Sequence, residues 1–119
     1  MAVAQVANIG STGIIVSCVI ANGTTESDEI ATNGMVVWGI LLPTWTTATI
    51  TFKQGYVAGT RALVCDGVTA ATNYTVQTTI AQWVPVDPAK GIGAAGFVSL
   101  VSSAAQGADR TIYVLLRYI

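Results

Sequence analysis

The sequence contains no histidine, so the carboxylates are the first side chains to consider for acid–base chemistry. Without an imidazole there is no Ser-His or Cys-His pair, and no Ser-x-x-Lys spacing replaces one. The remaining arrangement is a pair of carboxylates, with Asp66, Asp87 and Asp109 as candidates. All three stand in turn-like segments, where Asp commonly accepts a hydrogen bond from nearby backbone. We therefore expect a protein that is not an enzyme and needs no cofactor.

An acidic cluster lies early in the chain, at Glu26, Asp28 and Glu29. A calcium ion takes six to eight oxygen ligands, so these three carboxylates would need help from backbone carbonyls. We favour a solvated loop before a strand and predict no metal site. A calcium site is the alternative.

Residues 91–96 spell a literal G-x-G-x-x-G, and Asp109 follows near the offset of a ribose-binding acid. That motif binds a dinucleotide only where a strand leads into it and a helix opens from it. Here Pro85 and Pro88 precede the glycines, and a strand-like run, residues 97–102, follows them. We expect a close-turning loop between two strands.

The sequence also contains two cysteines and three tryptophans, whose environments can be predicted from their neighbours. Cys18 and Cys65 each stand in an apolar, strand-like run, which favours a pair of buried free thiols over a disulfide. Trp38, Trp45 and Trp83 suit either anchoring in a core or interface, which we favour, or stacking on a carbohydrate.

The elements that position these residues are predicted to be strands. Residues 47–53 alternate strictly, with Ala48, Ile50 and Phe52 on one face and polar side chains on the other. Glycine- and asparagine-containing turns separate the runs, and no stretch of ten or more residues has a helical apolar stripe. The pattern predicts one all-β domain over residues 14–119, a sandwich or barrel. The other strand-like runs are residues 14–21, 35–42, 62–66, 73–79, 97–102 and 111–118.

Three of these runs, residues 14–21, 35–42 and 111–118, are apolar on both faces. Strict alternation in residues 35–42 would place Val36, Trp38 and Ile40 on one face of the strand and Val37 on the other. One face of such a strand fills the core, so the second needs its own cover. We favour contact with another subunit; loops folded over the sheet are the alternative.

Scarcity of charge supports a partner. Only 9% of the residues are charged, against about 25% in ordinary soluble proteins. Eleven charged side chains on a surface of roughly 6,000 Å² leave wide neutral areas of the kind that contact other proteins or membranes. The net charge of −1 argues against nucleic acid as the partner. No apolar run is long enough to span a bilayer, and the N-terminus lacks the pattern of a secretory signal.

The first 13 residues have neither charge nor a clear period. They suit a first strand or an extended arm that docks on a partner by strand addition.

The sequence also resembles a family of small structural proteins of tailed bacteriophages. The likeness runs from about residue 26 to the end of the chain. It is carried by SDEI at 27–30, Gly34, Gly39-Ile40, PTWTTATITF at 43–52, VDP at 86–88, AQGADRTI at 105–112 and LR at 116–117.

The resemblance implies a virion component with a jelly-roll-like antiparallel β-sandwich. Such proteins decorate and cement phage heads, often as trimers, or form fibre, neck and tail modules. We accordingly expect a decoration protein, made in the host cytoplasm, on the outer surface of the head, with the major capsid protein and copies of itself as partners. The alternative is a receptor- or glycan-binding module with an aromatic cleft of Trp45, Tyr56 and Trp83. The expected contact residues are Val3, Val6 and Ile9 in the arm and Val36, Trp38, Ile40 and Tyr113 in the apolar faces.

Overall fold

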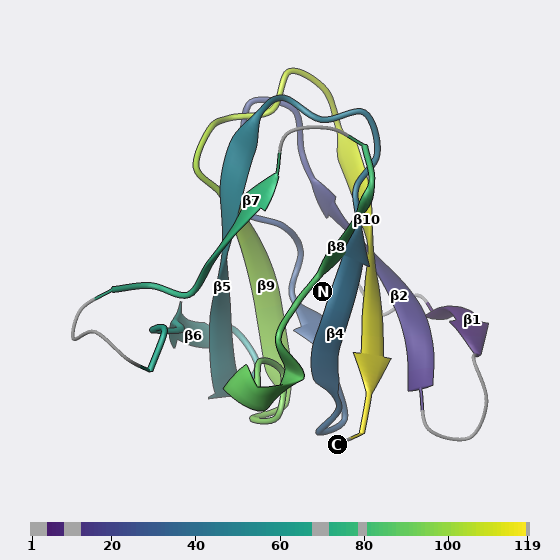
Figure 1. The fold of residues 1–119 in the computed structure, drawn as a ribbon, viewed down its shortest axis with the longest axis vertical. Helices are drawn as coiled ribbons and strands as arrows, with labels where there is room; N and C mark the ends of the chain where they lie inside the picture. Colours follow the sequence, from purple (N-terminus) through teal and green to yellow (C-terminus); the bar gives the residue numbers. More distant parts are fainter. Residues whose placement is uncertain (1–4, 9–12, 68–71, 79–80, 119) are drawn as a thin grey trace.

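The strand-like runs of the sequence assemble into two antiparallel sheets (Figure 1). A computed structural model of the chain describes residues 5–8, 13–67, 72–78 and 81–118. The first sheet has the order β1 (Gln5–Asn8), β2 (Gly13–Ile20), β10 (Arg110–Arg117), β4 (Val36–Leu41), β8 (Trp83–Pro85). The second sheet has the order β3 (Ile30–Ala31), β9 (Phe97–Ser102), β5 (Ala48–Val57), β6 (Thr60–Leu63), and β7 (Thr75–Thr78) also pairs with β5.

The strand pairings are nested along the chain. β2 pairs with β10, β3 with β9, β4 with β8, and β5 with β7, so early strands meet late ones and the middle strands meet each other. This pattern is one long antiparallel ribbon folded into two sheets, the arrangement of a jelly roll. The predicted all-β, jelly-roll-like sandwich is therefore confirmed.

The first 13 residues include a strand. Gln5–Asn8 forms β1, which pairs antiparallel with β2 at the edge of the first sheet. This is the first-strand alternative for the segment. Val3 and Ile9 lie outside the described residues, and for Val6 only the backbone position in β1 is described.

The core lies between the sheets, where alternate side chains of both meet. In β5 the predicted inward set is confirmed, because Ala48, Ile50 and Phe52 are all buried. Ile112 and Leu116 of β10 reach the same core from the first sheet. Burial of such side chains stabilises the fold by about 1.5–3 kcal/mol each.

A β-bulge in β4 overturns the predicted faces of that strand. Leu115 of β10 lies opposite Gly39, and the next residue of β10 lies opposite Val37, so Trp38 is an extra residue. The bulge shifts the alternation by one, and both Val37 and Ile40 lie in the core. Val36 is 1% exposed and Ile40 is 0% exposed. The prediction that these two residues contact another subunit was wrong, because the chain itself covers them.

The glycine-rich segment is a loop, as predicted. It follows a short 3-10 helix, η1 (Pro88–Lys90), which Asp87 caps by accepting a hydrogen bond from the Ala89 amide at 2.9 Å. Ile92 is fully buried in the core. Gly93 has φ +104°, and a Cβ there would lie 2.6 Å from the carbonyl oxygen of Met35. No helix opens from these glycines, and β9 follows them directly.

Both cysteines are free, but only one is buried. Cys18 lies in the core, whereas Cys65 is exposed. The expectation of two buried thiols is therefore right for Cys18 and wrong for Cys65. Burial is the main cause that raises the pKa of the Cys18 thiol to about 12.

Iodoacetamide at pH 8 is expected to modify Cys65 and to spare Cys18 in the folded protein. The thiolate is the reactive form, and a pKa of about 12 leaves Cys18 almost entirely protonated at that pH. Mass spectrometry of the two cysteine-containing peptides measures the difference. Both should react in urea, and equal reaction of both in the native protein would contradict the buried environment of Cys18.

Candidate interaction surface

The outer face of the first sheet is almost free of charge. Its strands carry only two charged side chains, Arg110 and Arg117, at the two ends of β10. Between them an apolar row crosses the sheet. Tyr113 lies opposite Leu41 of β4, and Leu41 lies opposite Trp83 of β8. Side chains at paired positions project from the same face, so these three form one continuous surface.

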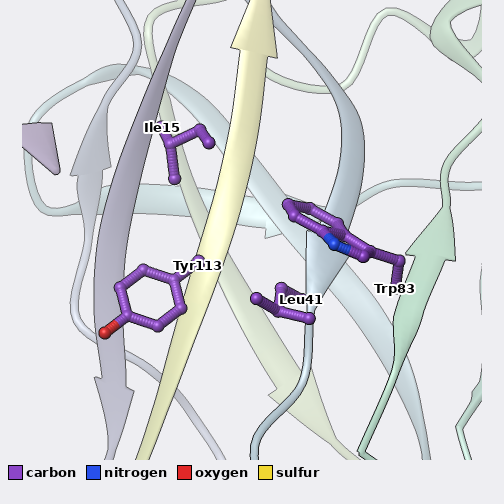
Figure 2. Close-up of a pocket in the computed structure, with 4 residues that line it drawn as sticks. All are labelled: Ile15, Leu41, Trp83 and Tyr113. Carbon is purple, nitrogen blue, oxygen red and sulfur yellow. The ribbon is translucent and has the colours of Figure 1, made fainter. Parts of the chain in front are cut away.

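Ile15, Leu41, Trp83 and Tyr113 line a hollow of about 210 Å³ on this face. Figure 2 shows Leu41 between the two aromatic side chains, with Ile15 on β2 beside them. Trp83 is exposed, and the other three side chains are half-buried. Because the hollow is open, an apolar or aromatic side chain of another molecule can contact all four lining residues. We refer to this site, lined by these four residues, as the hollow.

Trp38 lies on β4 beside Arg117, whose guanidinium carbon is 5.8 Å from the centre of the indole ring. This geometry is that of a cation–π contact. The indole is half-buried, and its N–H has no acceptor among the described residues. Trp38 is therefore half-buried like three residues of the hollow, and its contact with another subunit stays a prediction.

The predicted contact residues lie in different environments, and contact of Tyr113 with another subunit stays a prediction. Tyr113 lies in the hollow, whereas Val36 and Ile40 are buried in the chain. Leu41 was not predicted to lie on this face, because strict alternation placed it toward the core, and the bulge reverses that placement. The strand around Trp83 was not predicted, because β8 has only three residues and ends at a proline.

The outer face of the second sheet is different, because it carries an ionic cluster. Glu26 accepts from Lys53 and from Arg61, both at 3.0 Å, and Arg61 also pairs with Glu29. Ser99 on β9 donates to Glu26 at 2.8 Å and accepts from the Arg61 Nε at 3.0 Å. We call Glu26, Glu29, Lys53, Arg61 and Ser99 the ionic cluster.

The ionic cluster corrects the prediction of a solvated acidic loop. Glu29 is 9% exposed, and the carboxylates of Glu26 and Glu29 accept from cationic side chains. The described residues hold no group of three or more metal-ligating side chains. The acidic segment is therefore bonded to strands β5, β6 and β9 of the second sheet.

The ionic cluster lowers the pKa of the Glu26 carboxyl below its ordinary value of 4.5. Burial alone would raise this pKa, but the hydrogen bonds from Lys53, Ser99 and Arg61 together outweigh it. A carboxyl whose pKa is lower in the folded chain stabilises the fold above its unfolded pKa, and that stabilisation is lost as the pH falls.

The free energy of unfolding is accordingly expected to decrease below about pH 4.5. Urea titrations at a series of pH values from 7 to 3 measure this decrease. Glu26→Gln should show a shallower decrease, because it removes the group that takes up the proton. The same slope in both proteins would contradict the role of Glu26.

The aromatic cleft proposed for glycan binding is not assembled. Trp45 is 7% exposed, and its Nε1 donates to Thr78 Oγ1 at 2.9 Å in the core. Tyr56 lies on β5 of the second sheet, whereas Trp83 lies on β8 of the first. The prediction that these three side chains form one cleft was wrong.

The carboxylates of Asp87 and Asp109 have structural partners. Asp87 caps η1 as described above, and Asp109 accepts from the Asn22 amide at 2.8 Å, joining two loops. The backbone carbonyl of Asp66 accepts from the Lys90 ammonium at 2.7 Å.

Within the part of the chain that the structure describes, no helix has the length and apolar character needed to cross a membrane.

The face with the hollow is therefore the candidate functional surface. Comparison with protein-family models, with curated proteins and with solved structures finds no match to this chain.

Proposed function

We propose that the protein is a non-enzymatic structural protein of a phage virion, a decoration protein that binds the outer surface of the head as a homo-oligomer. The observation that carries this proposal is the apolar outer face of the first sheet, which contains the hollow. The outer face of the second sheet instead carries the ionic cluster, whose charged side chains are partly exposed to water.

The contrast between the two faces supports assembly. A sheet exposed to water normally alternates apolar and polar side chains, as β5 does with Thr49, Thr51 and Lys53 on its outer side. The outer side of the first sheet instead presents aromatic and aliphatic groups, the residue types enriched at the centre of protein interfaces. One face therefore suits solvent, and the other suits a protein partner.

The kind of assembly is proposed from the sequence. Residues 26–119 resemble tailed-phage virion proteins, and the jelly-roll topology agrees with the fold that this resemblance implies. Decoration proteins of this kind bridge neighbouring capsomers, commonly as trimers, and reinforce the shell against internal DNA pressure. The major capsid protein is the proposed partner.

Co-sedimentation with capsids that lack decoration protein tests this function. We expect the purified protein to pellet with the capsids at saturating stoichiometry and to raise the temperature at which they release DNA. A protein that stays in the supernatant over the whole concentration range would contradict the proposal.

Removing residues 1–13 is expected to abolish capsid binding, because this uncharged segment is the proposed capsid contact. Circular dichroism and thermal melting serve as the folding control, because the deletion also removes β1 from the sheet edge. Unchanged binding by the folded deletion variant would exclude this segment as the contact and leave the rest of the proposal intact.

A further inference from the structure

The hairpin formed by β5 and β6 presents an unusual apolar tip. Tyr56 is 82% exposed, and Val57 and Leu63 on the same hairpin are also exposed. Residues 55–60, which form the tip, contain no charged side chain. Single exposed apolar residues are ordinary, whereas three large ones on one hairpin make that hairpin a candidate contact site.

The tip is held in a fixed position. Gly55 lies so close to Thr60 that a Cβ at residue 55 would overlap the Thr60 carbonyl oxygen. The Gly59 amide donates to Glu29 at 2.8 Å, and Arg61, two residues further on, pairs with the same carboxylate. Four of the eleven charged side chains of the protein, those of the ionic cluster, therefore lie at this hairpin. A group held in place before binding loses little entropy on binding.

The hollow matches the tip in chemistry, and it is open to the outside. Its volume of about 210 Å³ leaves room for a side chain that enters from another molecule. All four residues of the hollow are apolar or aromatic. No charged side chain lines it, so an uncharged tip enters without desolvating an ion.

A chain cannot fill its own hollow with this tip. The hairpin belongs to the second sheet and the hollow to the outer face of the first (Figure 1). We propose that the β5–β6 hairpin of one copy inserts Tyr56 into the hollow of a second copy. This inference rests on the oligomeric part of the proposed function. Because the hairpin tip and the hollow are different surfaces, the contact is heterologous and closes into a ring when the rotation between neighbouring copies allows it. The trimer of the proposed function is one such ring.

The outer face is large enough to form the centre of such a contact. Strands β2, β10, β4 and β8 contain 8, 8, 6 and 3 residues, which at about 3.3 Å per residue and about 4.8 Å between strands cover roughly 400 Å². A standard interface buries about 800 Å² per partner, so the flanking loops must supply about half of it.

Cysteine cross-linking tests the contact directly. In a Cys65→Ser background, the variants Tyr56→Cys and Leu41→Cys are prepared separately, mixed and oxidised. We expect a disulfide-linked dimer in the mixture and none in either variant alone. Thr51→Cys, on the outer face of the second sheet, replaces Tyr56→Cys as the matched control and should give no cross-link with Leu41→Cys. Self-cross-linking of Leu41→Cys would show that two hollows meet face to face and would overturn the proposal.

Sedimentation equilibrium provides a second, independent measurement. Tyr56→Ala should weaken self-association at least tenfold, because an aromatic anchor is lost, whereas Tyr56→Phe should retain it. An unchanged association constant for Tyr56→Ala would overturn the proposal even if the protein still binds capsids. Trimers that dissociate on Tyr56→Ala but never bind capsids would instead contradict the proposed function and leave the contact standing.

Discussion

Leu41→Asp is expected to dissociate the oligomer and to remove capsid binding while the monomer stays folded. In the isolated chain Leu41 is half-buried at the open hollow, so the new carboxylate remains hydrated and the free energy of unfolding should fall by only about 1 kcal/mol. In an assembly the same carboxylate would be buried without a partner, which costs several kcal/mol. We expect at least about a thousandfold loss of association, equivalent to roughly 4 kcal/mol.

Light scattering coupled to size-exclusion chromatography measures the oligomer, and co-sedimentation measures capsid binding. Thr51→Asp is the matched control, because it adds the same charge to the outer face of the second sheet. It should leave both measurements unchanged. Equal effects of the two substitutions would indicate a general influence of charge, and an intact oligomer with Leu41→Asp would contradict the role of the hollow.

Arg61→Ala is expected to lower the free energy of unfolding by about 3 kcal/mol, the lower end of the usual effect of removing one partner from a buried ion pair, because the Arg61 side chain is 17% exposed. Arg61 pairs with Glu29 and Glu26 and bonds Ser99. Its removal leaves the carboxylate of Glu29, which is 9% exposed, without its cationic partner. Urea denaturation at pH 7 measures the change.

Lys53→Ala is the control for this substitution. Lys53 pairs with Glu26 at 3.0 Å, but a third of its side chain is exposed. Exposed pairs contribute about 0–1 kcal/mol, so Lys53→Ala should have a small effect. A loss for Arg61→Ala no larger than that for Lys53→Ala would contradict the view that the ionic cluster stabilises the β5–β6 hairpin.

Local patterns predicted most of the long strands. The alternation in residues 47–53 identified β5 and its inward face, because a half-buried strand must alternate. The short strands β3 and β8, of two and three residues, have no pattern of their own. They are strands because longer partners supply their hydrogen bonds.

The candidate surface was predicted only in part for the same reason. Its existence followed from runs that are apolar on both faces, and Tyr113 was placed on it correctly. Which residues of β4 lie on this surface depends on the bulge, and the bulge arises from the pairing of β4 with β10 and not from either strand alone. Because of the bulge Leu41 faces outward and Ile40 faces the core, and β8 contributes Trp83 to the surface.

The sequence by itself determined the all-β class, the turn positions and the scarcity of charge, because these depend on residue type and near-neighbour spacing. Tertiary structure decided which apolar face is covered, which carboxylates are paired and where the aromatic residues meet. Glu29 and Arg61 are 32 residues apart, and Ile15 and Tyr113 are further apart still. Only the folded ribbon, which pairs early strands with late ones, brings such residues together and leaves one neutral face with a hollow for a partner.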